Sequence, residues 1–400
     1  MLQSVLGSLA LGYRPLWGRA RTLCGIELRL QEADPSAAVD VRHLLRTLKE
    51  IWAPHSPPLL LAPQSRQLLC DLLEQAPPGT PWVQVQGDWL SDSTVFQRVQ
   101  SAHQRGIQLV WRGDAGQLPD AAVIRLFDNS LLTLQPEAAV LALQGGAGSS
   151  QALVGQMYEG ILSRTLVEHC LDQQKAHAVI DWPVEDVLHS MRFQQLQPSH
   201  AVVHRLMKAI DAEQSLEAFE DILSEDPLLA YRFMTYTNSA ALGLRSGVDS
   251  LRRGLVMMGY GSLMGWLLTQ APHTSTEPNL HPVRIAMVLR AKLAEQLIEA
   301  GVAMELRREV YLCGLFSRMD ELLDEPLGTI LHRIPLSERI YDAAVLRSGP
   351  YASSLLMACA LETGDASVVC QLCEDHELEL EEVNRTLLRV LAGLEVAQAP

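Results

Sequence analysis

The apolar positions between residues 215 and 268 repeat at helical spacing and predict several short helices, each with its own cap. Ser215 begins the first helix, since its hydroxyl can accept a hydrogen bond from an unpaired backbone N–H of the first turn. Asp226 can cap the second helix in the same way, and Pro227 suits its first position because proline has no N–H to leave unpaired. The predicted helix ends are Asn238 with Ser239, and then Gly259.

In the first half of the chain, short runs of strand-forming residues alternate with helical patterns. We predict strands at residues 12–16, 25–30, 59–62, 82–86, 107–111, 123–127 and 179–180, and helices at 41–52, 65–74, 91–105 and 166–170. Alternating strands and helices are typical of parallel βα units, and several units in so short a segment indicate a small or incomplete barrel. The predicted fold class of this half is therefore α/β, with a trimmed barrel of the TIM type.

The second half carries helical patterns alone. Its further predicted helices span residues 281–300, 304–323, 336–346, 352–361 and 381–394. Pro183 and Pro198 lie in a stretch that resembles a junction between domains. We therefore predict two domains, an α/β domain at residues 1–188 and an all-helical domain at residues 189–400.

Composition places the chain among ordered proteins of a reducing compartment. Its 400 residues are 48% hydrophobic and 20% charged, which suffices for two buried cores. The formal net charge of −15 argues against a nucleic-acid-binding protein with a broad basic face, although a local basic patch stays open. Seven cysteines without the spacing of a disulfide framework favour the cytoplasm.

No segment of the sequence has the pattern of a membrane anchor. Residues 1–18 are apolar, but they lack the basic start of a secretory signal and are too short to span a bilayer. We interpret them as an early strand and expect a cytoplasmic protein without direct membrane insertion.

The helical stretch carries a specific motif. It reads L-E-x-x-x-x-I-L-S-x-D-P-L-L from Leu216, then T-N-S-A from Thr237, then M-G-Y-G-S-L from Met258. This pattern resembles the HDOD family, all-helical relatives of the HD phosphohydrolases that lack the metal-binding histidine and aspartate. The resemblance implies a bacterial signalling protein in which such domains serve interaction or output. Its signature residues here are Asp226, Pro227, Asn238, Ser239 and Gly259.

The residues that HD hydrolases use for metal binding are missing from the matching place. Ser317 and Arg318 stand where the family has adjacent His and Asp, and the dipeptide His-Asp occurs nowhere in the chain. We therefore expect no hydrolysis by this half. Residues 311–365 also resemble the C-terminal part of one subset, the two-domain EAL–HDOD proteins.

The first half resembles the EAL domain, a barrel-type cyclic di-GMP phosphodiesterase fold. The resemblance rests on YRPLWGRARTLCGIELRL from Tyr13, RGIQLVWRGDAG from Arg105, AVIRLF from Ala122 and YEGILS from Tyr158. Enzymes of this family need two divalent cations, held by several carboxylates and an Asn, to activate water and neutralise the phosphodiester.

Most of the positions implied as cation ligands are altered. Glu27 and Glu159 fall on glutamates of the family pattern. The departures are Leu28 and Arg29 after the signature glutamate, Ala62 for an Asn, Gln84 for a glutamate, Arg112 and Gly113 for paired aspartates, Phe127 for an aspartate and Leu162 for a glutamate, while Arg125 stands in for a lysine. Two carboxylates cannot hold two cations, and the alternative for both glutamates is that they are solvent-facing strand-end residues.

Three further groups are candidates for binding. Arg245, Arg252 and Arg253 form a basic cluster that suits an acidic partner or a phosphate, or is simply a solvated face. Arg14 and Arg29, near the barrel mouth, are suited to contact phosphates without metal, or are ordinary surface residues. The spacing Cys370-x-x-Cys373-x-x-His376 is compatible with a metal site, whereas in a helix such cysteines commonly just pack inward.

We interpret the chain as a non-catalytic signalling protein that binds other signalling proteins, with no metal and no cofactor. The resemblance implies a link to cyclic di-GMP signalling, motility or surface attachment. One alternative is a cyclic di-GMP receptor that binds without hydrolysis, and another is a residual metal-dependent phosphodiesterase. The sequence names neither the partner nor the oligomeric state.

Overall fold

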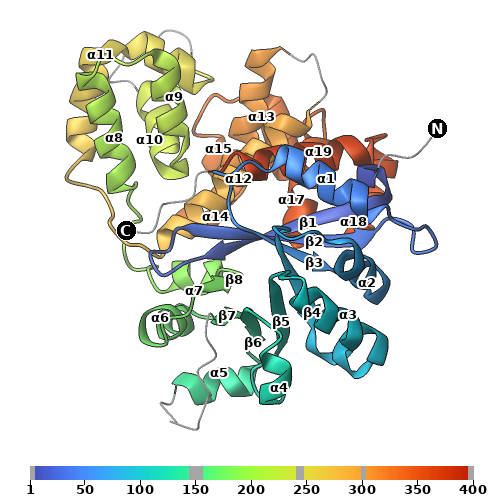
Figure 1. Ribbon diagram of the computed structural model, residues 1–400. Coiled ribbons are helices and arrows are strands. Elements are labelled where there is room, and N and C mark those ends of the chain that lie inside the picture. Colours follow the sequence, from blue (N-terminus) through green and yellow to red (C-terminus); the bar gives the residue numbers. More distant parts are fainter. Residues whose placement is uncertain (1–4, 144–155, 240–246, 299–302, 395–400) are drawn as a thin grey trace. The chain divides into compact units, whose positions relative to one another are not determined.

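The structure is a computed structural model that describes residues 5–143, 156–239, 247–298 and 303–394. The chain divides into two compact units (Figure 1). The first joins Met1–Pro183 to Ala360–Pro400, and the second is Val184–Cys359. Each unit is described by itself.

The first unit is built around a closed barrel of eight strands in chain order. The strands are β1 (Leu9–Trp17), β2 (Leu23–Glu32), β3 (Leu59–Pro63), β4 (Trp82–Gln86), β5 (Leu109–Asp114), β6 (Asn129–Thr133), β7 (Gln156–Glu159) and β8 (Ala178–Ile180). β1 runs antiparallel to both neighbours, β2 and β8, and all other neighbours are parallel. The predicted α/β fold class with a TIM-like barrel is confirmed.

Helices on the outside connect the strands. They are α1 (Val41–Ile51), α2 (Arg66–Gln75), α3 (Ser93–Gln104), α4 (Ala121–Ile124), α5 (Pro136–Leu143) and α6 (Arg164–Glu168). Asp40, Ser65 and Asp92 cap the first three through side-chain oxygens that accept backbone N–H bonds. The eight strands close the barrel, so it is a small barrel and not an incomplete one.

One predicted strand is wrong. Residues 123–127 contain β-branched residues, but the structure forms α4 there, and the strand is β6, Asn129–Thr133. The first helical turn begins after Asp120, and Asp128 ends the segment by accepting a hydrogen bond from the Leu109 N–H at 2.9 Å. Arg125 and Phe127 therefore do not lie on a barrel strand, and Thr133 takes the strand-end place.

The C-terminal helices α18 (Ala366–Asp375) and α19 (Leu380–Ala392) belong to the barrel unit. The buried amide of Asn384 donates to the carbonyls of Leu6 and Leu9 at 2.7 and 2.6 Å and accepts from the Leu11 N–H at 3.3 Å. In the division of the chain into compact units, residues 360–400 therefore belong with the first half of the chain and not with the second. The domain boundary between residues 188 and 189 stays a prediction from sequence.

The second unit is all-helical. Its helices are α7 (Val184–His189), α8 (His200–Asp211), α9 (Leu216–Ser224), α10 (Pro227–Thr237), α11 (Leu251–Gln270), α12 (Leu280–Leu297), α13 (Met304–Phe316), α14 (Met319–Leu323), α15 (Leu327–Leu331), α16 (Glu338–Tyr341) and α17 (Ala352–Thr363), which crosses the division. Gly259 splits α11 with φ 66°, so the predicted helix end at this glycine is confirmed. The predicted helix at 304–323 is interrupted between α13 and α14, at Ser317 and Arg318.

Candidate functional site

The barrel interior has an apolar layer with a polar layer next to it. The apolar layer consists of Leu16, Leu60, Val110, Leu131, Met157, Ala178 and Ile180. Arg112, Thr133 and Glu159 each follow an apolar-layer residue by two positions on β5, β6 and β7, so they face the same interior nearer the carboxyl ends of the strands. This end of a parallel barrel is where functional residues ordinarily lie.

Arg14 lies at the centre of the polar layer. Its Nε and Nη2 donate to both carboxylate oxygens of Glu27, the register partner of Arg14 on β2. Its Nη2 also donates to Glu159 at 2.9 Å, and its Nη1 donates to Asp181 at 2.9 Å. One guanidinium thus joins three carboxylates from β2, β7 and the end of β8.

Glu159 has a second cationic partner. Arg112 donates from Nε and Nη2 to its two oxygens at 2.7 and 2.9 Å, and the Thr133 hydroxyl donates to it at 2.6 Å. Burial would raise the pKa of Glu159, but Arg112 and Arg14 outweigh it and hold that pKa below its usual value. Burial also raises the pKa of Asp181, which Arg14 opposes in part.

The expectation that the two glutamates face solvent is wrong. Glu27 is 0% exposed and Glu159 is 3% exposed. Both point inward because the period-two alternation of their strands turns them into the barrel, where the arginines compensate their charges.

The polar layer does not fit a pair of divalent cations. Glu27 and Glu159 are each occupied by guanidinium groups, and Ala62, Gln84 and Arg112 supply no carboxylate at the other positions. Within the described ranges, no three His, Cys, Asp or Glu side chains form a group that could hold a metal ion. Gln84 is buried as well, and neither polar atom of its side chain has a protein hydrogen-bond partner.

Arg29, also proposed for phosphates, is engaged within the barrel unit. Its guanidinium donates to the Thr363 carbonyl and to the Gln64 side chain, both at 3.2 Å. Its stem packs so closely on Gly364 that a Cβ there would lie 2.9 Å from the Arg29 Cδ. Arg29 thus fastens the C-terminal segment to β2.

In the helical unit, Asp226 is a buried junction of three segments. Its carboxylate caps α10 by accepting from the Leu229 N–H at 2.9 Å, as predicted. It also accepts from the Ser199 N–H at 2.7 Å and pairs with Arg284 of α12 at 3.2 Å. Pro227 occupies the first position of α10. These contacts hold the starts of α8 and α10 against α12.

Asn238 joins the end of α10 to the residues that precede α11. Its amide donates to the Val248 carbonyl and its oxygen accepts from the Val248 N–H, at 2.8 and 2.7 Å. Ser239 donates to the Tyr236 carbonyl at 2.7 Å. The contacts of both residues are to the backbone, as expected of residues that position a helix end.

The arginine cluster is paired where the structure describes it. Arg252 donates to Glu217 at 2.7 Å and lies 3.8 Å from Glu220, and Arg253 lies 3.5 Å from Asp249. Arg245 lies outside the described residues. Since acidic side chains already surround Arg252, this face offers an acidic partner less free positive charge than the sequence suggests.

Neither the positions that match the HD motif nor the cysteine motif forms a metal-binding group among the described residues. Ser317 accepts from the buried Arg290 at 3.4 Å, and Arg318 pairs with Glu321. Cys370 and Cys373 lie on α18, where burial raises the pKa of Cys373 to about 11 and so disfavours the thiolate that binds metals. His376 is exposed at the helix end.

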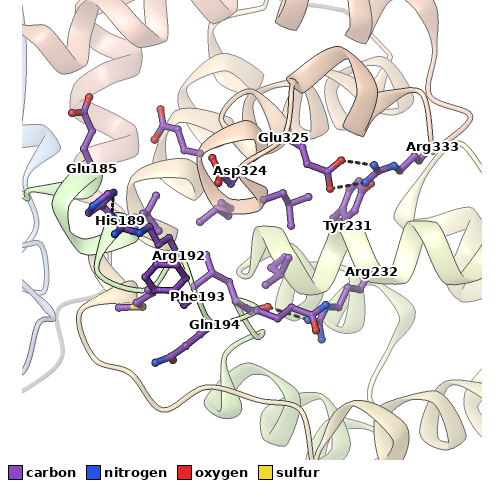
Figure 2. Close-up of a pocket in the computed structure, with 18 residues that line it drawn as sticks. Glu185, His189, Arg192, Phe193, Gln194, Tyr231, Arg232, Asp324, Glu325 and Arg333 are labelled. Carbon is purple, nitrogen blue, oxygen red and sulfur yellow. Dashed lines mark hydrogen bonds and ion pairs between the residues drawn. The ribbon is translucent and has the colours of Figure 1, made fainter.

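A cavity of about 790 Å³ lies in the helical unit among α7, α10 and α14 (Figure 2). Arg192, Phe193 and Arg232 line it together with Asp324 and Glu325. Sequence reasoning missed this site, and it also missed Asp181, Thr133 and Arg284. The sequence gives one hint: Arg192 and Phe193 are adjacent in the junction between Pro183 and Pro198, where no helix is predicted that could bury the aromatic ring.

Comparison with known proteins identifies the helical half. Residues 196–323 match the family model of the HDOD domain, which confirms that the chain contains an HDOD domain, while the predicted bounds of residues 189–400 stay a prediction. Cyclic di-GMP phosphodiesterase CdgJ of Vibrio cholerae serotype O1 is 23% identical over 195 residues, 48% of this chain and 45% of CdgJ. The uncharacterized protein YuxH of Bacillus subtilis is 21% identical over 196 residues, 47% of this chain and 46% of YuxH.

The chain therefore spans about half the length of the curated relatives that it matches, 45% and 46%. Among solved structures, the MmoQ response regulator of Methylococcus capsulatus is 16% identical, with 50% of this chain and 72% of that chain covered. Its TM-score of 0.28 is too low to support an argument about fold. No helix among the described residues is long and apolar enough to cross a membrane.

The Glu159→Gln variant tests the polar layer. At neutral pH it leaves Arg112 without its carboxylate partner and removes one of the three carboxylates that Arg14 binds, so we expect about 3 kcal/mol lower free energy of unfolding. Because the pKa of Glu159 is lowered by folding, the difference from the wild type should shrink as pH falls below the usual value of 4.5. Urea unfolding of the variant and the wild type, at several pH values from neutral to acid, measures this difference in the free energy of unfolding.

The matched control is Glu137→Gln, at an exposed glutamate of α5. It should change the free energy of unfolding by less than about 0.5 kcal/mol at every pH. A Glu159→Gln variant as stable as the control at neutral pH would show that the ion pairs of Glu159 do not stabilise the barrel.

The Asp226→Asn variant tests the junction in the helical unit. The amide oxygen can still cap α10, but Arg284, which is 7% exposed, loses its counter-charge. We expect the unit to lose about 3 kcal/mol of stability, measured by thermal or urea unfolding. Asp249→Asn, which breaks an exposed pair with Arg253, is the control and should cost less than about 1 kcal/mol. Equal losses in both variants would refute the assigned role of Asp226.

Proposed function

We propose that this protein is a non-catalytic signalling protein that works by binding other proteins through its HDOD domain. The barrel resembles that of cyclic di-GMP phosphodiesterases in sequence motifs, and CdgJ, a distant relative, carries that activity in its name. We place the chain in the same signalling system, in the cytoplasm, because its seven cysteines lack the spacing of a disulfide framework.

The observation that carries the proposal is the pairing of Glu27 and Glu159 with arginines. A two-cation phosphodiester hydrolase needs carboxylates that are free to bind metal. Here Arg14 and Arg112 supply the positive charge, and they cannot activate a water molecule as a divalent cation does, because a guanidinium does not coordinate the water oxygen as a Lewis acid. In this proposal the barrel is a structural scaffold, and the protein acts through the surfaces that it presents to partner proteins.

A second candidate is a cyclic di-GMP receptor without hydrolysis. It is favoured by the guanidinium groups at the carboxyl end of the barrel, since arginine suits phosphate oxygens. Against it, the Arg14 side chain is 14% exposed and that of Arg112 22%, and both already bind carboxylates. A phosphate would have to displace those partners.

The test is turnover by the full chain. We expect no linear dinucleotide to form from cyclic di-GMP with Mg²⁺ or Mn²⁺, as followed by anion-exchange chromatography beside an active phosphodiesterase. The Glu27→Gln variant should give the same blank. Product from the wild type that disappears in Glu27→Gln would overturn the proposal. Calorimetry with cyclic di-GMP on the same sample identifies the receptor if it shows saturable micromolar binding.

A further inference from the structure

The cavity beside α10 continues into a second one. A cavity of about 520 Å³ shares Gln195, Tyr231 and Arg232 with the first cavity of about 790 Å³. Together they make an elongated site on both sides of Arg232, within the range of volumes that hold ligands. All lining residues belong to the helical unit.

Arg232 is a fixed cation in this site. Its guanidinium is held by three neutral oxygens, those of Leu196, Gln197 and Gln270, at 3.0, 2.9 and 3.4 Å. Burial lowers its pKa, and the more distant Asp226 only partly opposes this. Among the described residues no carboxylate forms an ion pair with it, so its positive charge is positioned but not neutralised.

Arg192 and Phe193 form an exposed pair at the opposite end of the first cavity. The guanidinium lies 4.7 Å from the ring centroid, and its Nη1 is 3.0 Å from the His189 Nδ1. The Phe193 side chain is 89% exposed. An exposed aromatic ring stacked by an arginine is the composition typical of binding hot spots.

The other wall of the cavity is acidic. Figure 2 shows Asp324 on the side of the cavity opposite Arg192 and Phe193, and Glu325 beside it turned toward Arg333. Glu325 is paired with Arg333, whereas exposed Asp324 has no cationic partner in the described part of the chain. Leu188, Met191, Leu228 and Leu322 contribute apolar surface between the walls. A uniformly anionic ligand would be repelled by Asp324.

We propose that this groove binds an extended segment of a partner protein, in which an acidic side chain pairs with Arg232 and a nearby apolar side chain packs on Phe193. Opposite charges on the two walls orient the segment, with its acidic residue on the arginine side. The inference rests on the proposed function, because it locates the protein-binding surface of the HDOD domain. Two adjoining cavities favour an extended chain over a compact small molecule.

The probe is a phage-displayed library of random peptides of about twelve residues, selected on the immobilised full-length chain. We expect enriched sequences to place Asp or Glu within a few residues of Leu, Phe or Trp. A fluorescent synthetic copy should bind Arg232→Gln and Phe193→Ala at least about tenfold more weakly, as measured by fluorescence polarisation.

Arg205→Gln is the matched control, because Arg205 is an exposed arginine of the same unit that does not line either cavity. It should bind like the wild type. Phe193→Ala changes only an exposed ring, so its effect separates lost binding from lost folding. Circular dichroism checks that Arg232→Gln keeps its helices.

Three outcomes would overturn the inference: no enrichment, enriched peptides without acidic residues, or equal binding by Arg232→Gln and the wild type. Saturable binding of inorganic phosphate that Arg232→Gln abolishes, without peptide binding, would instead assign the groove to a small anion. None of these outcomes bears on the barrel, whereas cyclic di-GMP turnover would refute the proposed function and leave the peptide result standing.

Discussion

A carboxylate placed inside a barrel must be compensated by positive charge, and in this protein Arg14 provides it. Glu27 and Glu159 are 0% and 3% exposed, and an isolated ionised group at such positions would cost many kilocalories per mole. Arg14 reaches both, and Asp181 as well, while Arg112 binds Glu159 through both oxygens. The charges are satisfied within the protein, by groups that stabilise the carboxylates but do no metal chemistry.

The helical unit uses the same device. Asp226 is buried and is paired with Arg284, and its remaining oxygen contacts fix the starts of α8 and α10. Buried pairs of this kind are weak evidence for net stability but strong evidence for fixed geometry, because removing one partner leaves the other charge buried and unpaired. Among the described residues that line the groove, Arg232 and Asp324 have no ion-pair partner, and these two groups point to a binding partner.

Local features of the fold could be read from the sequence, whereas long-range ones could not. Ser215 and Asp226 cap helices as predicted, because capping depends on neighbouring residues. Residues 123–127 misled because Val123 and Ile124 favour strands, yet a single helical turn forms there. Glu27 was recognised but placed in solvent, since its burial depends on Arg14, its cross-strand partner, and on strand closure. The groove lay beyond prediction because loops and the four helices α7, α10, α11 and α14 assemble it.

Titration of the full chain with Mn²⁺, followed by electron paramagnetic resonance, tests most directly whether arginines have taken the place of cations in the barrel. The account predicts no saturable Mn²⁺ binding that differs between the wild type and the Glu27→Gln variant, since Arg14 occupies that carboxylate in the wild type. A tight Mn²⁺ site in the wild type that Glu27→Gln abolishes would contradict it.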